Sequence, residues 1–213
     1  MFSNRQQAGE ALSAKLSSYR GNTSVVMGLA RGGVVVAAQL ARALGTPLDV
    51  VVVKKIGSPY EPELALGAVA PDGVTHVDWR MAHRMAADEE YIKTQIAELN
   101  DQIRQKTLLY RKGKKPLSLK DKTVILVDDG AATGATVEVA IKWAKVKSAK
   151  KIVVALPVAP PETVAHIKPE VSEVVVLETP ENLGSVGQFY QSFGQVEDEE
   201  VIELLKDSKT KRQ

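Results

Sequence analysis

The stretch TVILVDDGAATGAT, residues 123–136, holds the most informative pattern in the chain. Four apolar residues at 124–127 run directly into two carboxylates, Asp128 and Asp129, and a loop of small residues then leads into a segment with helical apolar spacing. This order predicts a buried strand, a loop at its carboxyl end and a helix whose N-terminus faces the loop. Ligands of open α/β sheets bind at the carboxyl ends of the strands, so we expect a binding site here.

The loop offers different chemistry at its two ends. Small residues at 130–132, together with Gly134, allow backbone N–H groups to approach an anion closely, and the start of the helix adds partial positive charge. Thr133 and Thr136 add hydroxyl groups. One end therefore suits a phosphate, and the acidic end suits a sugar diol or a hydrated metal ion. The simpler interpretation, solvated acids before an ordinary threonine cap, needs only one of these residues.

The run resembles the phosphoribosyl pyrophosphate (PRPP) motif of the type I phosphoribosyltransferases, in which four apolar residues, two acids, about three small residues and Thr-Gly-x-Thr follow one another. The chain matches this pattern at every position from Val124 to Thr136. The resemblance implies that Asp128 and Asp129 are catalytic and hold the ribose hydroxyls, directly or through waters of a Mg²⁺ cofactor. It also implies a site for the 5′-phosphate at Gly130, Ala131, Ala132, Thr133, Gly134, Ala135 and Thr136.

A second turn, GLARGG at residues 28–33, also follows a predicted strand and precedes a predicted helix. Alone it is a weak signal, but its glycines permit close approach of a ligand and its arginine can donate two parallel hydrogen bonds to phosphate oxygens. In the family this turn is the pyrophosphate loop and often contains a cis peptide bond, here between Ala30 and Arg31. The pyrophosphate-binding residues implied are Ala30, Arg31, Gly32, Gly33 and Lys55, the last at the end of the next strand.

The rest of the chain alternates strand and helix patterns. This βαβ order predicts an α/β fold with an open, mainly parallel twisted sheet flanked by helices. One or two short edge strands and one long charged helix interrupt the alternation. The predicted strands cover 24–30, 48–53, 64–70, 73–78, 123–127, 151–158 and 171–177, and the predicted helices cover 7–16, 34–44, 81–110, 134–146 and a short segment after Pro161.

We expect a single domain over residues 1–207, with a helical insertion at about 79–116, a C-terminal hood at about 178–205 and a polar tail at 208–213. The resemblance extends from Phe2 to Leu205 and includes the N-terminal run RQQAG. It is closest to a subgroup of stand-alone enzymes whose acceptor is generally unassigned. Residues 56–63 resemble the mobile loop that covers PRPP in this family.

Composition excludes several classes of function. The chain has no cysteine, so disulfides, cysteine-based zinc sites and thiol catalysis are ruled out. With 28 basic and 26 acidic residues its formal net charge is only +2, and we expect no nucleic-acid partner. No apolar run has secretory or membrane-spanning length, so we expect a cytoplasmic protein with no membrane partner. The resemblance also favours a homodimer.

The implied function is transfer of 5-phosphoribosyl from PRPP to a nitrogen acceptor, a nucleobase or similar molecule, with release of pyrophosphate. Ala132 stands where the 6-oxopurine enzymes have an Asp, which argues against those bases as acceptors. The alternative is a regulator that senses PRPP or a nucleotide without turnover. A generic phosphate-binding kinase or dehydrogenase is disfavoured, because neither a Walker pattern nor a Gly-x-Gly-x-x-Gly turn is present.

Overall fold

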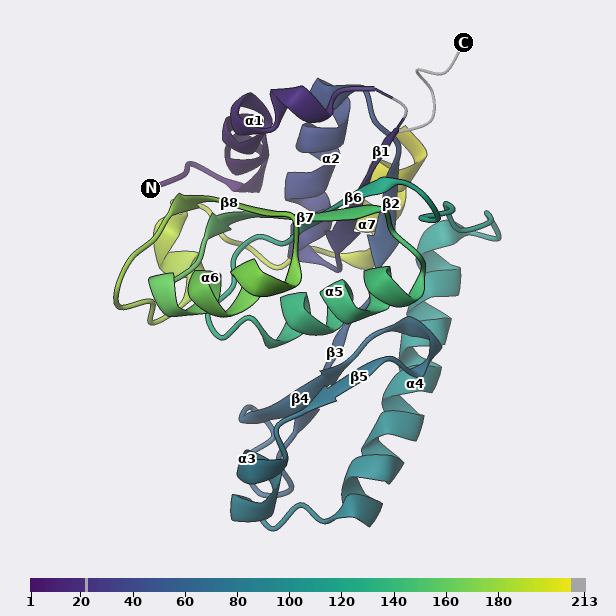
Figure 1. Ribbon diagram of the computed structural model, residues 1–213, viewed down its shortest axis with the longest axis vertical. Helices are drawn as coiled ribbons and strands as arrows, with labels where there is room; N and C mark the ends of the chain where they lie inside the picture. The colour runs from purple at the N-terminus through teal and green to yellow at the C-terminus, as the bar shows by residue number, and fades with distance from the viewer. Residues whose placement is uncertain (22, 208–213) are drawn as a thin grey trace.

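The computed structural model describes residues 1–21 and 23–207. Its centre is a five-stranded sheet in the order β2-β1-β6-β7-β8 (Figure 1), and every neighbouring pair is parallel. The predicted α/β fold class is therefore confirmed. The strands are β1 (Ser24–Leu29), β2 (Leu48–Val51), β6 (Thr123–Val127), β7 (Lys151–Val158) and β8 (Glu173–Glu178).

Helices cover both faces of this sheet (Figure 1). Because side chains alternate along a strand, Ile125 packs into the core on one face and its neighbour Leu126 into the core on the other. Both side chains are fully buried, as expected for a parallel sheet covered on two sides. The first face is covered by α1 (Arg5–Lys15) and α2 (Gly32–Leu44), and the second by α5 (Ala135–Val146) and α6 (Pro161–Ile167).

A second, antiparallel sheet lies beside the main one in the order β3-β4-β5. The sequence pattern placed Lys54 and Lys55 at the end of the second main strand and the next two strands at the edge of the main sheet. Both expectations were wrong, because β2 ends at Val51 and the chain then pairs Lys54 with Val69 in the new sheet. The three strands are β3 (Lys54–Gly57), β4 (Ala65–Val69) and β5 (Thr75–Val77).

The predicted long helix at 81–110 is two helices, α3 (Trp79–Arg84) and α4 (Glu89–Arg111). Ala86, with a φ of 53°, reverses the chain between them. Each helix has its own aspartate cap: Asp78 accepts from the Met81 N–H, and Asp88 accepts from the Tyr91 N–H. Helix α4 then runs along the second sheet and returns to the main body (Figure 1).

The C-terminal segment crosses the molecule. It leaves β8 at one edge of the main sheet and ends in α7 (Asp198–Asp207), which packs with α2, α4 and the opposite edge strand β2. On the way, Tyr190 pairs with Phe2, whose N–H donates to the Phe189 carbonyl oxygen. The segment predicted as one hood thus forms two structures, a cover at 179–197 and helix α7 beside the edge strand β2.

Short 3-10 turns complete the described structure, at Ser17–Tyr19, Pro71–Gly73, Lys168–Glu170 and Val186–Phe189. No helix among the described residues is long and apolar enough to cross a membrane. The predicted polar tail at 208–213 lies outside the described residues.

Candidate active site

The two acids follow directly after β6, as predicted. Asp128 keeps some contact with solvent, yet protein atoms surround it densely, and its Oδ1 accepts a hydrogen bond from the Asp129 N–H at 2.9 Å. Burial, and then the charge of Asp129, raise the pKa of Asp128 well above its usual value, while the cation of Lys55 acts in the opposite direction. Asp128 therefore lies where negative charge is poorly compensated, which is a place suited to a cation.

Asp129 has a cationic partner that was not predicted. The Nε of Arg5, on the first turn of α1, donates to Asp129 Oδ2 at 2.7 Å, and the two side chains are only 12% and 16% exposed. Arg5 also donates from Nη1 to the Gly194 carbonyl oxygen at 2.8 Å and stacks over Phe193, 3.8 Å from the ring centroid. One side chain thus ties α1, the diacid and the C-terminal cover together.

Tyr190 supports the same acid from the cover. Its hydroxyl donates to the Asp129 carbonyl oxygen at 2.6 Å, and its ring lies 5.5 Å from that of Phe2 and 4.9 Å from that of Phe193. Burial, and then the charge of Asp129, raise the pKa of Tyr190, so the phenol stays a donor. These aromatics pack against one another and hold the cover onto the start of the chain.

The loop after the diacid leads into α5, and Ala132 and Thr133 on this loop are exposed. Gly134 caps the helix with a φ of 80°, a conformation that favours glycine. The loop is fixed by the Thr163 hydroxyl, which donates to the Ala132 carbonyl oxygen at 2.6 Å. The Ala131 N–H already donates to the Val158 carbonyl oxygen at 3.0 Å, so the available amides begin after Ala131.

The glycine turn after β1 touches the diacid. Its Ala30–Arg31 peptide bond is cis, as predicted, and Gly32 and Gly33 form the first turn of α2. A Cβ on Gly33 would lie 2.9 Å from Asp128 Oδ1, and one on Gly32 would lie 1.9 Å from Asp129 Oδ2. Only glycine therefore allows this approach. The N-terminus of α2 thus lies against the two acids, and the loop that follows the acids leads into the N-terminus of α5.

Arg31 is the predicted residue whose side chain lies away from the acids. Its Nη1 is 3.8 Å from Glu197 Oε2 and 3.9 Å from Asp198 Oδ1, at the start of α7. Lys55 comes from β3, in the second sheet, and is close enough to influence the titration of Asp128. The structure thus brings together the diacid, the loop before α5, the glycine turn and Lys55, and it directs the Arg31 guanidinium elsewhere.

The diacid fits a Mg²⁺ ion that keeps most of its waters. Mg²⁺ is commonly bound through one or two carboxylates and substrate phosphates rather than by a protein cage. The described residues contain no group of three or more His, Cys, Asp or Glu side chains that could form such a cage. Two adjacent carboxylates, Asp128 and Asp129, are the donor set that this mode of binding uses.

A family model described as the phosphoribosyl transferase domain matches residues 3–190. The chain belongs to the type I phosphoribosyltransferase family. The Thermus thermophilus protein TT1426 is 40% identical, with a TM-score of 0.81 over 97% of this chain and 98% of that one. The Aquifex aeolicus protein AQ2163, 15% identical with a TM-score of 0.52 over 86% and 78% of the two chains, shares the fold.

Curated relatives agree with the family. A protein of Mycobacterium tuberculosis strain H37Rv, provisionally named a phosphoribosyl transferase, is 39% identical over 215 residues, which cover 96% of this chain and 46% of that protein. The same holds for its counterpart in strain CDC 1551. This phosphoribosyltransferase chain therefore spans about half the length of the curated relatives it matches.

Proposed function

We propose that this protein transfers the 5-phosphoribosyl group of PRPP to a nitrogen acceptor and releases pyrophosphate. The observation that carries the proposal is that the N-terminus of α2 touches Asp128 and Asp129, whose loop leads directly into the N-terminus of α5. A ligand that binds there needs phosphate groups for the amides and a diol or a hydrated cation for the acids. PRPP has a phosphate at C5, a diphosphate at C1 and two ribose hydroxyls between them.

Each part of PRPP has a proposed partner. The amides after Ala131 and the hydroxyls of Thr133 and Thr136 hold the 5′-phosphate, and Asp128 and Asp129 hold the ribose hydroxyls. The Gly32 and Gly33 amides and Lys55 take the pyrophosphate. Arg31 joins them only if its guanidinium leaves Glu197 and Asp198, from which it is separated by almost 4 Å.

In the reaction the C1–oxygen bond to pyrophosphate breaks, and the leaving group keeps the electron pair. The acceptor nitrogen forms the new bond to C1 and loses a proton. The transition state has oxocarbenium character, as in other glycosyl transfers. The chain's task is to align the two reactants, stabilise the departing charge and exclude water. A Mg²⁺ ion held by Asp128 and Asp129 would supply positive charge that stabilises the departing pyrophosphate.

We propose a nucleobase-like acceptor that is not a 6-oxopurine. Ala132, at the position of the base-contacting Asp in the 6-oxopurine enzymes, is exposed, and its carbonyl oxygen is engaged by Thr163. It offers no carboxylate to a purine ring. The cover at 179–197 is the nearest source of acceptor contacts, and the hairpin between β3 and β4, where Tyr60 is exposed, is proposed to close over the site. Homodimer formation and a cytoplasmic location stay predictions.

The test is a pyrophosphate-release assay with PRPP and Mg²⁺ against adenine, uracil, orotate, hypoxanthine, guanine, xanthine and nicotinate. Release that depends on one base supports the transferase and identifies its acceptor. Replacing both acids, Asp128→Asn with Asp129→Asn, should lower the rate by at least about 100-fold, as for other groups that stabilise developing charge. The control is Asp101→Asn on the exposed face of α4, which should keep the wild-type rate.

Binding of PRPP separates the proposal from its alternative. Calorimetric binding that needs both acids, with no release for any base, would favour a PRPP-sensing regulator. Full activity of the double variant would contradict the assignment of the diacid. Neither binding nor release would reject PRPP as the ligand.

A further inference from the structure

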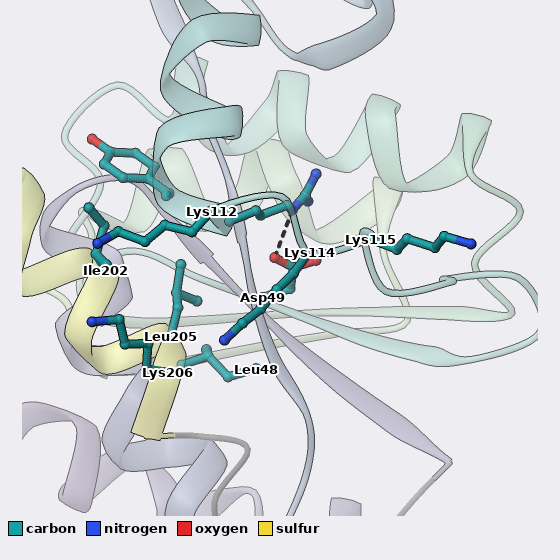
Figure 2. A pocket seen from close by; sticks show the side chains of 10 residues that line it. Leu48, Asp49, Lys112, Lys114, Lys115, Ile202, Leu205 and Lys206 are labelled. Carbon is teal, nitrogen blue, oxygen red and sulfur yellow. Dashed lines mark hydrogen bonds and ion pairs between the residues drawn. The ribbon is translucent and has the colours of Figure 1, made fainter.

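A basic hollow of about 190 Å³ lies at the amino-terminal end of β2, and neither acid of the diacid lines it (Figure 2). The candidate active site is at the carboxyl ends of the strands, so the two sites lie at opposite ends of the parallel strands. The hollow is formed where the end of α4 and the loop after it meet α7. Its apolar wall comes from Leu48, Ile202 and Leu205.

Five cationic side chains line this basic hollow, and the carboxylate among them already has partners. The cations are Arg111, Lys112, Lys114, Lys115 and Lys206. Lys112, Lys114 and Lys115 form no ion pair with any other residue that the structure describes. Since the whole chain carries a net charge of only +2, this concentration of unpaired positive charge is local.

The basic loop is anchored at both ends by one buried carboxylate. Asp49 Oδ1 accepts from Arg111 Nε at 3.0 Å, and Asp49 Oδ2 accepts from the Leu117 N–H at 3.0 Å. Arg111 also donates from Nη2 to the Val50 carbonyl oxygen at 3.2 Å. The lysines between these two anchors therefore lie on a loop that is held at both ends. The Arg111 guanidinium beside them is fixed through Nε and Nη2, which leaves Nη1 for a ligand.

The local backbone turns the lysines toward the hollow. Lys112, the residue that caps α4, has a φ of 46°, and Gly113 follows with a φ of 77°. In Figure 2 the side chains of Lys112, Lys114 and Lys206 extend to the same side of the hollow, whereas Lys115 points the other way. Lys206 is paired with Glu203 on its own helix at 2.5 Å, so the unpaired ammonium groups of Lys112 and Lys114 and the fixed guanidinium of Arg111 are the first contacts for a small anion.

The partial negative charge at the C-terminus of α4 balances this concentration of positive charge only weakly. A helix C-terminus carries about half a negative charge, and basic residues in its last turn compensate it. That explains Arg111 and Lys112. It does not explain Lys114, whose full charge outweighs the dipole, whereas Lys206, on another helix, is already paired with Glu203. The surplus of positive charge calls for a ligand with several negative charges.

We propose that this hollow binds a small polyphosphate anion, either free or as the phosphate tail of a nucleotide. Arginine forks and lysine point charges together recognise phosphate oxygens. A polynucleotide fits less well, because its binding surfaces extend as basic stripes and use exposed aromatics for stacking. Here the cations gather around one cavity, and the aromatic residue in its wall, Tyr110, is buried. The proposal does not depend on the transferase activity.

The test is isothermal titration calorimetry with sodium tripolyphosphate at low ionic strength, without divalent cations. The pocket variant combines Lys112→Gln, Lys114→Gln and Lys206→Gln. A matched variant with the same loss of charge combines Lys15→Gln, Lys93→Gln and Lys168→Gln, all exposed and distant from the hollow. Any binding of tripolyphosphate at the diacid should be the same in the pocket variant and in the matched variant, so a difference between them reports on the hollow. Circular dichroism checks that both keep their fold.

We expect the pocket variant to bind tripolyphosphate at least 10-fold more weakly than the matched variant, which should resemble wild type. Equal affinities in the two variants, or no saturable binding to wild type, would overturn the proposal. A titration with ATP tells a nucleotide tail from the free anion, because base contacts would make ATP bind more tightly. Binding of single-stranded RNA, lost in the pocket variant while tripolyphosphate does not bind, would reject the small anion in favour of a polynucleotide.

Discussion

Arg5 donates from Nε to Oδ2 of Asp129 at 2.7 Å, and so joins the first helix of the chain to the second acid of the PRPP motif. Asp128, the first acid, has the amide of its neighbour instead of an arginine, and burial raises its pKa. Two adjacent carboxylates thus have unequal surroundings. Such inequality gives the members of a pair different tasks in many active sites.

Replacement of Arg5 by Gln should weaken both the fold and the reaction. The change removes a charge-assisted hydrogen bond to Asp129 and the stacking on Phe193, and we expect a loss of about 1.5–3 kcal/mol in the free energy of unfolding. Misplacement of Asp129 should lower kcat/KM by roughly 10- to 100-fold. Urea unfolding and pyrophosphate release measure the two effects. Arg42→Gln, on an exposed part of α2, should change neither, and an unaffected Arg5 variant would show that the contact is dispensable.

Asp128→Asn should make the ligand-free protein more stable, and increasingly so at higher pH. A carboxyl whose pKa is raised on folding binds its proton more tightly in the folded state. Its contribution to stability therefore falls as the pH rises from the unfolded pKa of about 3.9 through the higher folded pKa. The asparagine does not titrate. Urea unfolding of both proteins between pH 4 and 8 should show a stability difference that grows with pH, and a constant difference would contradict the assignment.

Gly33→Ala should disturb the diacid directly. The new Cβ would lie 2.6 Å from the Val127 carbonyl oxygen and 2.9 Å from Asp128 Oδ1, so the backbone must shift. Overpacking of this kind costs about 1–3 kcal/mol, which lowers the melting temperature by roughly 2–4 °C for each kcal/mol in a chain of this size. Differential scanning calorimetry measures the shift. Gly194→Ala, where nothing lies within 4 Å of the new Cβ, is the matched control and should leave the melting temperature nearly unchanged.

Asp49→Ala should destabilise the protein far more than Asp101→Ala. Asp49 and Arg111 form a largely buried pair, with side chains 8% and 16% exposed, and removal of one partner leaves the other charge uncompensated. Buried pairs of this kind lose about 3–5 kcal/mol, whereas exposed pairs are worth about 0–1 kcal/mol. Asp101 and Arg104 are such an exposed pair. Urea unfolding compares the two variants, and similar losses would mean that Asp49 is not the anchor of the basic loop.

Local sequence patterns were sufficient to predict the strands at the centre of the main sheet. Strands β6 and β7 were predicted with the bounds that the structure has, because their apolar runs are bounded by polar residues and by glycine or proline. The cis bond before Arg31 followed from the family resemblance and is present. These features depend on residues that are close together in the sequence.

The expectations that failed depend on distant residues. The apolar run at 48–53 leads into Lys54 without a turn signal, so the change from one sheet to another at Val51 is decided by the pairing of β3 with β4. Arg5 lies 124 positions from Asp129, and nothing in the N-terminal run RQQAG indicates that contact. The orientation of Arg31 depends in the same way on acids at the start of α7.

The pairing of Phe2 with Tyr190 has a consequence for the order in which the chain matures. Phe2 and Tyr190 lie far apart in the sequence, so Phe2 is synthesised well before its partner. The βαβ units can form meanwhile, since their contacts are more local. Until Tyr190 is synthesised, Phe2 lacks the partner that buries it, so the diacid receives its cover only after the earlier βαβ units have been made.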